Sequence, residues 1–98
     1  MKRAKSIKRF FVYILKCKDG TFYTGYTNDL KKRIGLHNTG KGAKYVKGRG
    51  PAKLVYAKEY VFRKHAMKIE RKIKAMTRKR KIKLIGTYGK TFGQRFLK

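Results

Sequence analysis

The stretch that decides the fold is FFVYILKCKDGTFYTGYT, residues 10–27. Its two ends, Phe10–Lys16 and Thr21–Thr27, are rich in aromatic and β-branched residues, a composition typical of β-strands. Between them, residues 18–20 (Lys-Asp-Gly) fit a three-residue hairpin loop in which the glycine takes the left-handed conformation. The sequence therefore predicts an antiparallel β-hairpin at the start of the domain.

The length of that loop decides which residues of the two strands face each other. With three loop residues, Leu15 pairs with Tyr23 and Tyr13 pairs with Gly25. The side chains of Tyr13 and Tyr23 then lie on one face of the sheet as diagonal neighbours, about 7–8 Å apart at the backbone. A two-residue Asp-Gly turn would shift the pairing and place the two tyrosines on opposite faces.

The chain after the hairpin predicts a helix, a basic loop and one further strand. Asn28 is placed to cap a helix over Asp29–Asn38. Residues 38–51 hold four glycines among lysines and arginines and predict a flexible basic loop. Lys53–Phe62 is the third predicted strand, and its near-continuous apolar stretch indicates burial on both faces.

Two more helices complete the prediction. One spans Arg63–Met76, and its apolar stripe consists of Phe62, Ala66, Ile69, Ile73 and Met76. Thr77 is expected to cap a short last helix that ends near Gly86. The order ββαβαα predicts an α+β fold, with a three-stranded, mainly antiparallel sheet flanked by helices. We expect a basic arm over residues 1–9, the folded domain over 10–85 and a basic tail rich in glycine and aromatic residues over 86–98.

Positive charge dominates the composition. The chain has 98 residues, one domain by size, and carries 30 Lys and Arg against 4 Asp and Glu, a formal net charge of +26. Self-repulsion on this scale indicates a polyanionic partner such as a nucleic acid. No apolar run approaches the ~20 residues of a membrane span, so no membrane partner is expected. The single cysteine, Cys17, excludes an internal disulfide and a structural zinc cluster, and it predicts a reducing, cytoplasmic compartment.

The scarcity of carboxylates excludes several kinds of hydrolase. A two-metal site needs several convergent carboxylates, and a glycosidase needs a flanking pair of acids. One Mg²⁺ ion held by one carboxylate, with waters and a substrate phosphate as its other ligands, remains compatible with this chain. Glu70, at the edge of its helix's apolar stripe, is the candidate anchor, and its simpler interpretation is an i,i+4 ion pair with Lys74.

The tyrosine pair is the first candidate for chemistry. Strand tyrosines more often simply pack, and that interpretation competes with a functional one. In the functional interpretation, the hydroxyls of Tyr13 and Tyr23 on one face position or deprotonate a water molecule. Gly25, opposite Tyr13, would leave room for a substrate backbone.

Arg33 and His37 are one turn apart on the helix that follows the hairpin. A histidine on its own is more often a core residue with its hydrogen bonds satisfied. With Arg33 on the same side, a phosphate-binding pair becomes competitive, because the guanidinium fork matches the oxygens of a phosphate.

The basic loop after this helix carries the candidate contacts to nucleic acid. Its cations fit contacts to phosphates, and its tyrosine could stack a base. These residues are Lys41, Lys44, Tyr45, Lys47 and Arg49. A solvated basic loop explains each of them individually about as well.

Taken in order, these residues resemble the GIY-YIG nuclease domain, in particular its small stand-alone group. The first signature triplet stands as FVY at residues 11–13 and the second as YTG at residues 23–25. The segment from Tyr26 to Arg33 is similar to the family's strand-to-helix segment, and Glu70 falls where the family has its metal-binding glutamate. The resemblance covers about residues 10 to 85.

What this resemblance implies is hydrolysis of a DNA phosphodiester bond with one Mg²⁺ or Mn²⁺ ion. By the resemblance, Tyr13 would help to activate water, Tyr23 would assist at the phosphate and Arg33 would stabilise the developing charge. Glu70 would bind the ion, and His37 would transfer a proton or bind phosphate. The implied partner is DNA, branched and damaged forms included, with RNA left open.

A non-catalytic alternative also stays open. Phe11 stands where the family's first triplet has glycine. A basic DNA- or RNA-binding protein that keeps the fold would use the same positive charge for backbone contacts. In that alternative Glu70 can be replaced without consequence, whereas the enzyme needs it.

Overall fold

The sheet has three antiparallel strands in the order β2-β1-β3, which confirms the predicted ββαβαα arrangement and its α+β class. This is seen in a computed structural model, which describes residues 9–38 and 51–91. The strands are β1 (Phe10–Lys16), β2 (Phe22–Thr27) and β3 (Lys53–Tyr60). The helices are α1 (Leu30–Asn38), α2 (Arg63–Lys74) and α3 (Arg78–Thr91).

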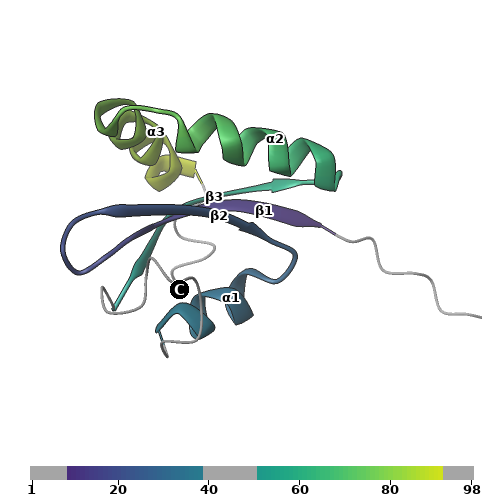
Figure 1. Cartoon of the computed structure of the whole chain (residues 1–98), viewed down its shortest axis with the longest axis horizontal. Coiled ribbons are helices and arrows are strands. Elements are labelled where there is room, and N and C mark those ends of the chain that lie inside the picture. The colour runs from purple at the N-terminus through teal and green to yellow at the C-terminus, as the bar shows by residue number, and fades with distance from the viewer. Residues whose placement is uncertain (1–8, 39–50, 92–98) are drawn as a thin grey trace, which may run out of the picture.

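Helices cover both faces of the sheet. Helix α1 lies against one face, and α2 and α3 lie together against the other (Figure 1). The central strand β1 is therefore enclosed on both sides, and residues 12–15 are almost completely buried. Tyr13 bonds to His37 of α1, so Tyr13 and Leu15 face that helix. Because successive side chains of a strand point to opposite faces, Val12 and Ile14 face the layer of α2 and α3.

The β1–β2 hairpin has the predicted register. Gly20 has a φ of +85°, and its N–H donates to the Cys17 carbonyl at 2.9 Å. The Cys17 N–H in turn donates to the carbonyl of Thr21 at 2.8 Å, which closes a three-residue loop. Tyr13 pairs with Gly25, so both tyrosines of the predicted pair lie on the α1 face of the sheet.

Helix α1 begins one step later than predicted, and its cap is not Asn28. The carboxylate of Asp29 accepts the backbone N–H of Lys32 at 3.1 Å, while the hydroxyl of Thr27 accepts the N–H of Asp29 at 3.1 Å. Asp29 is thus the capping residue, because its side chain has the reach to satisfy an otherwise unpaired N–H of the first turn. Its negative charge also suits the positive end of the helix.

The sequence predicted that Phe62 belongs to the apolar stripe of α2, and the structure shows that it does not. Strand β3 ends at Tyr60, and Phe62 is the extended residue before the helix, with φ −106° and ψ 133°. Helical spacing does not apply to a residue with extended backbone, and the Phe62 side chain is 70% exposed. The other predicted stripe residues behave as expected, with Ala66 and Ile73 buried.

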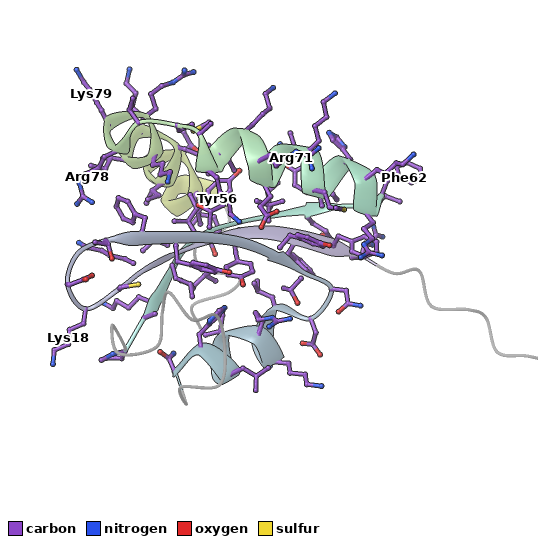
Figure 2. The ribbon with its side chains drawn as sticks, viewed as in Figure 1. Lys18, Tyr56, Phe62, Arg71, Arg78 and Lys79 are labelled. Atoms are coloured by element: carbon purple, nitrogen blue, oxygen red, sulfur yellow. The ribbon has the colours of Figure 1, made fainter. Side chains whose placement is uncertain are left out.

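Helix α3 is longer than predicted. Thr77 caps it as expected, because its hydroxyl accepts the N–H of Arg80 at 3.2 Å. The helix then continues past Gly86 to Thr91. Tyr88 is buried against Tyr56, with ring centroids 5.8 Å apart, and Figure 2 shows Tyr56 between the sheet and the helices. Burial of an aromatic ring outweighs the roughly 1 kcal/mol that a glycine costs inside a helix.

The described helices are also too short or too polar to cross a membrane.

Candidate active site

A buried tyrosine–histidine pair lies between the sheet and α1. Tyr13, on the central strand, is 1% exposed, and its hydroxyl oxygen lies 3.0 Å from Nε2 of His37. His37 lies in the last turn of α1 and is also buried. The two residues are 24 positions apart in the sequence, so it is the packing of α1 on the sheet that brings them together.

Tyr23 completes a cluster of three rings. Its ring centroid lies 6.3 Å from that of Tyr13 and 5.3 Å from that of His37, the latter in an edge-to-face arrangement. Tyr23 is half-buried, whereas the other two side chains are enclosed. Tyr23 is therefore the most accessible member of this Tyr13–Tyr23–His37 cluster.

Gly25 makes the cluster possible, but for a reason the sequence did not suggest. A Cβ at this position would lie 2.7 Å from the hydroxyl oxygen of Tyr13 and 3.1 Å from the ring of Tyr23. The room that we expected for a substrate backbone is filled by Tyr13 itself. The missing side chain lets the Tyr13 ring lie across β2 and reach His37.

Burial sets the protonation states of the pair. Desolvation raises the pKa of Tyr13 far above its usual value; the neighbouring Tyr23 and Glu70 raise it further, and the charge of Arg33 partly opposes them. Burial also lowers the pKa of His37, and Arg33 lowers it further. At neutral pH Tyr13 keeps its proton and His37 is uncharged. In the tautomer with its proton on Nδ1, His37 accepts the Tyr13 hydroxyl hydrogen at Nε2.

Arg33 is the charged residue of α1 that acts on this cluster. It is exposed on α1, one turn before His37, and its charge acts on both members of the buried pair. Its side chain lines a cavity of about 510 Å³ that opens at the edge of the sheet. The other lining residues are Phe10, Tyr26, Thr27, Asn28 and Arg63.

Glu70 comes from the opposite helical layer. Its side chain, 15% exposed, forms an ion pair with Lys74 in which Oε2 lies 3.3 Å from Nζ. This is the i,i+4 pair of the simpler interpretation. The negative charge of the carboxylate nevertheless reaches Tyr13, since it contributes to the raised pKa of that hydroxyl. Arg33 and Glu70 thus act on the same tyrosine from helices on opposite faces of the sheet.

The donor set suits a cation that needs one protein carboxylate. In residues 9–38 and 51–91, no three side chains of the His, Cys, Asp and Glu type gather into a cage. Mg²⁺ does not require one, because it keeps several waters and often binds through one or two carboxylates plus substrate phosphates. Glu70, half-buried and close enough to act on Tyr13, fits that role.

The structure adds two residues that the sequence did not single out. Arg63, the first residue of α2, directs Nε and Nη2 at the hydroxyl of Tyr26, each at 3.4 Å, and both residues line the cavity beside Arg33. They are 37 positions apart, and no periodicity in the sequence links them. The loop residues predicted to contact nucleic acid, Lys41, Lys44, Tyr45, Lys47 and Arg49, lie outside the described residues.

Known proteins resemble this chain over the segment that forms the fold and the candidate site. The model of the GIY-YIG catalytic domain matches residues 9–83. The UPF0213 protein OB0043 of Oceanobacillus iheyensis is 49% identical over 78 residues, 80% of this chain and 91% of that protein. The UPF0213 protein CPE1444 of Clostridium perfringens is 53% identical over 77 residues, 79% of this chain and 83% of that protein. The solution NMR structure of the UPF0213 protein BH0048 from Bacillus halodurans is 42% identical, with a TM-score of 0.58, and covers 90% of this chain and 94% of its own.

Proposed function

The chain belongs to the GIY-YIG catalytic domain family, and on that premise we propose that it is an endonuclease that hydrolyses DNA phosphodiester bonds with the aid of one divalent cation. The observation that carries the proposal is the 3.0 Å hydrogen bond between the hydroxyl of Tyr13 and Nε2 of His37, beside the guanidinium of Arg33. In this arrangement, a pair of residues that can transfer a proton lies beside an arginine that can bind phosphate.

The buried pair supplies a path for the proton of the attacking water. As the water oxygen forms its bond to phosphorus and the bond from phosphorus to the leaving ester oxygen breaks, the Tyr13 oxygen takes a proton from the water and passes its own hydrogen to Nε2 of His37. The leaving oxygen takes up a proton from solvent, and His37 later returns its extra proton to solvent. The tyrosine stays neutral throughout, which suits a hydroxyl whose pKa is raised by burial. General-base catalysis of this kind contributes about 10²- to 10⁴-fold to a rate.

Arg33 and Tyr23 act on the phosphate. The exposed guanidinium of Arg33 can place two N–H groups on the non-bridging oxygens and offset the charge that develops there. Tyr23, the accessible member of the cluster, would assist at the same phosphate through its hydroxyl. Positioning and electrostatic stabilisation supply most of the rate in reactions of this class.

Glu70 would hold the cation, Mg²⁺ or Mn²⁺. When bound, the cation would polarise a non-bridging oxygen and help to neutralise the charge of the transition state. Glu70 then has to exchange its ion pair with Lys74 for the cation. This exchange costs little, because an ion pair with an exposed lysine is worth only about 0.3–0.5 kcal/mol.

The net charge of +26 supports a nucleic-acid substrate. Contacts to phosphates are independent of sequence, so this charge suits branched and damaged DNA as well as a regular duplex, and RNA in the same way. We propose DNA as the substrate because the chain matches the GIY-YIG catalytic domain over residues 9–83 and the resemblance to that nuclease domain implies DNA.

One observation favours a second candidate, a binding protein without catalytic activity. The Glu70–Lys74 pair, at 3.3 Å, is what an ordinary helix surface would show. In that case the charge of the chain would serve backbone binding, and no cation would be needed.

The test is cleavage with and without Mg²⁺ on single-stranded, duplex, flapped and branched DNA, comparing the wild type with Glu70→Ala. The matched control is Glu59→Ala, which removes the exposed partner of Arg9 on β3. We expect Glu70→Ala to abolish cleavage and to leave the DNA affinity without metal unchanged or slightly tighter. Glu59→Ala should cleave as the wild type does. Equal behaviour of all three proteins, with no cleavage by any, would favour the binding protein instead.

A further inference from the structure

Phe62 is the most exposed large apolar side chain among the described residues. It is 70% exposed, against 50% for Val61 and 50% for Ile82. Figure 2 shows it at the end of the molecule where α2 begins, outside the layer between the helix and the sheet.

Phe62 also stands directly before α2, where its side chain makes no hydrogen bond to the helix. A Ser, Thr, Asp or Asn there would stabilise the helix by about 0.5–2 kcal/mol. The ring therefore contributes to neither the core nor the helix end.

The surroundings of Phe62 are cationic. The next two residues, Arg63 and Lys64, are cations, and both are exposed. The nearest carboxylate along the described chain, Glu59, is paired with Arg9 at 3.2 Å. An apolar ring among cations is a poor match for an apolar protein surface, because the cations would lose hydration without gaining partners. It is a good match for a polyanion that also offers apolar faces, as stacked bases do.

The residue that follows Phe62 in the chain, Arg63, lines a cavity with two arginines. Arg63 and Arg33 both line this cavity of about 510 Å³, and Phe10 and Tyr26 contribute aromatic walls. The guanidinium of Arg63 is oriented by the hydroxyl of Tyr26, with Nε and Nη2 each at 3.4 Å. The volume lies within the range of pockets that hold small ligands. The two arginines therefore offer this cavity two cationic groups that can bind phosphate oxygens.

We propose that Phe62 is a wedge that stacks on, or inserts between, the bases of the nucleic acid whose phosphates Arg33 and Arg63 contact. Proteins that distort nucleic acid use such apolar side chains between base steps, with flanking cations on the backbone. The inference rests on the proposed function, since Arg33 is the residue that ties this cavity to the reacting phosphate. It adds to that function a substrate whose base stack is opened beside the cleaved bond.

The chain contains no tryptophan, which allows a direct test. Phe62→Trp introduces a single fluorescent ring at the proposed wedge, and Ile82→Trp introduces one on α3 as the matched control. Each full-length protein is titrated with duplex and single-stranded DNA in the absence of divalent metal. We expect stacking on bases to quench the fluorescence of Phe62→Trp and to leave that of Ile82→Trp nearly unchanged.

Affinity supplies a second readout. Phe62→Ala is expected to weaken DNA binding by about 5- to 150-fold, the effect of losing one stacked base. It should leave the slope of log K against log salt unchanged, because no charge is removed. Arg63→Ala should reduce that slope by about one.

Three results would overturn the wedge. One is tight DNA binding by Phe62→Trp with no quenching, together with wild-type affinity of Phe62→Ala. Another is a dimer, without DNA, that Phe62→Ala dissociates. The third is quenching by anionic lipid vesicles and not by DNA. The proposed function fails separately: quenching by DNA without Mg²⁺-dependent cleavage would support the wedge and reject the nuclease, and cleavage without quenching would do the reverse.

Discussion

The ring of Tyr13 lies across the backbone of Gly25, so that a Cβ built on the glycine would be only 2.7 Å from the Tyr13 hydroxyl oxygen. The two residues are directly paired in the register of the hairpin. This close approach holds the hydroxyl over β2, in the buried layer beneath α1, where Nε2 of His37 lies 3.0 Å away. The glycine of the second triplet thus makes room for the tyrosine of the first and so fixes the position of its hydroxyl.

Gly25→Ala should inactivate the protein by displacing Tyr13. The added methyl group would clash with the hydroxyl and with the ring carbon that carries it, 2.9 Å away. We expect a loss of stability of about 1–3 kcal/mol from overpacking and a loss of cleavage of about 100-fold or more. Thermal unfolding and single-turnover cleavage measure the two effects.

Gly35→Ala is the matched control for that prediction. A Cβ at Gly35, on α1, would meet nothing within 4 Å. Alanine is favoured over glycine in a helix by about 1 kcal/mol, so this variant should be more stable than the wild type and fully active. Equal activity of Gly25→Ala and Gly35→Ala would show that the approach of Tyr13 to Gly25 has no part in cleavage.

Tyr13→Phe should separate chemistry from packing. It removes the hydroxyl that joins His37 to the attacking water and keeps the buried ring. We expect cleavage to fall by about 10²- to 10⁴-fold and stability by only about 1 kcal/mol, the net value of one hydrogen bond. Tyr56→Phe, which alters a buried tyrosine on the opposite face of the sheet, should cleave at the wild-type rate. A fully active Tyr13→Phe variant would remove this hydroxyl from the mechanism.

Stability and cleavage should both decrease as the pH falls below about 6.5. Burial lowers the pKa of His37 from its usual 6.5, so in this range the unfolded chain takes up a proton that the folded chain does not. The folded state is therefore favoured above pH 6.5, and this contribution is lost as the pH drops, by at most about 1.4 kcal/mol per pH unit. Protonated His37 also cannot accept the hydrogen of Tyr13.

Two variants test the origin of that pH dependence. His37→Gln should remove most of the change in stability between pH 5 and 7, so that its unfolding midpoint is nearly the same across this range. His65→Gln changes the other histidine, exposed at the start of α2, and should keep the wild-type slope. The same slope in all three proteins would assign the effect to another group.

Arg33→Ala should weaken binding and cleavage together, because the fork contacts phosphate before and during the reaction. Arg33→Lys keeps the charge and loses the bidentate geometry. We expect it to restore DNA affinity but not the rate of cleavage. Arg71→Ala, an exposed arginine of α2 away from the cavity lining, should cleave as the wild type does. DNA affinity and single-turnover rates at fixed salt distinguish these outcomes, and normal cleavage by Arg33→Ala would contradict the proposed role.

Local chemistry was enough for some of these features. A three-residue loop closed by a left-handed glycine fixes the hairpin register, and the register alone places Tyr13 and Tyr23 on one face. Thr77 was recognisable as a helix cap for the same reason, since its hydroxyl bonds to an N–H three residues ahead. These interactions span a few residues, so the identity of those residues determines them.

Contacts between distant segments depended on the packing. The partner of Tyr13 is 24 residues away, and the exposure of Phe62 and the extension of α3 to bury Tyr88 followed from where strand and helices end. The sequence by itself determined the strands, the hairpin register, the charge and the residue types available for chemistry. Only the tertiary structure decided which of them meet, because a long-range contact forms when the burial it brings exceeds the entropy of ordering both segments, and that balance belongs to the whole fold.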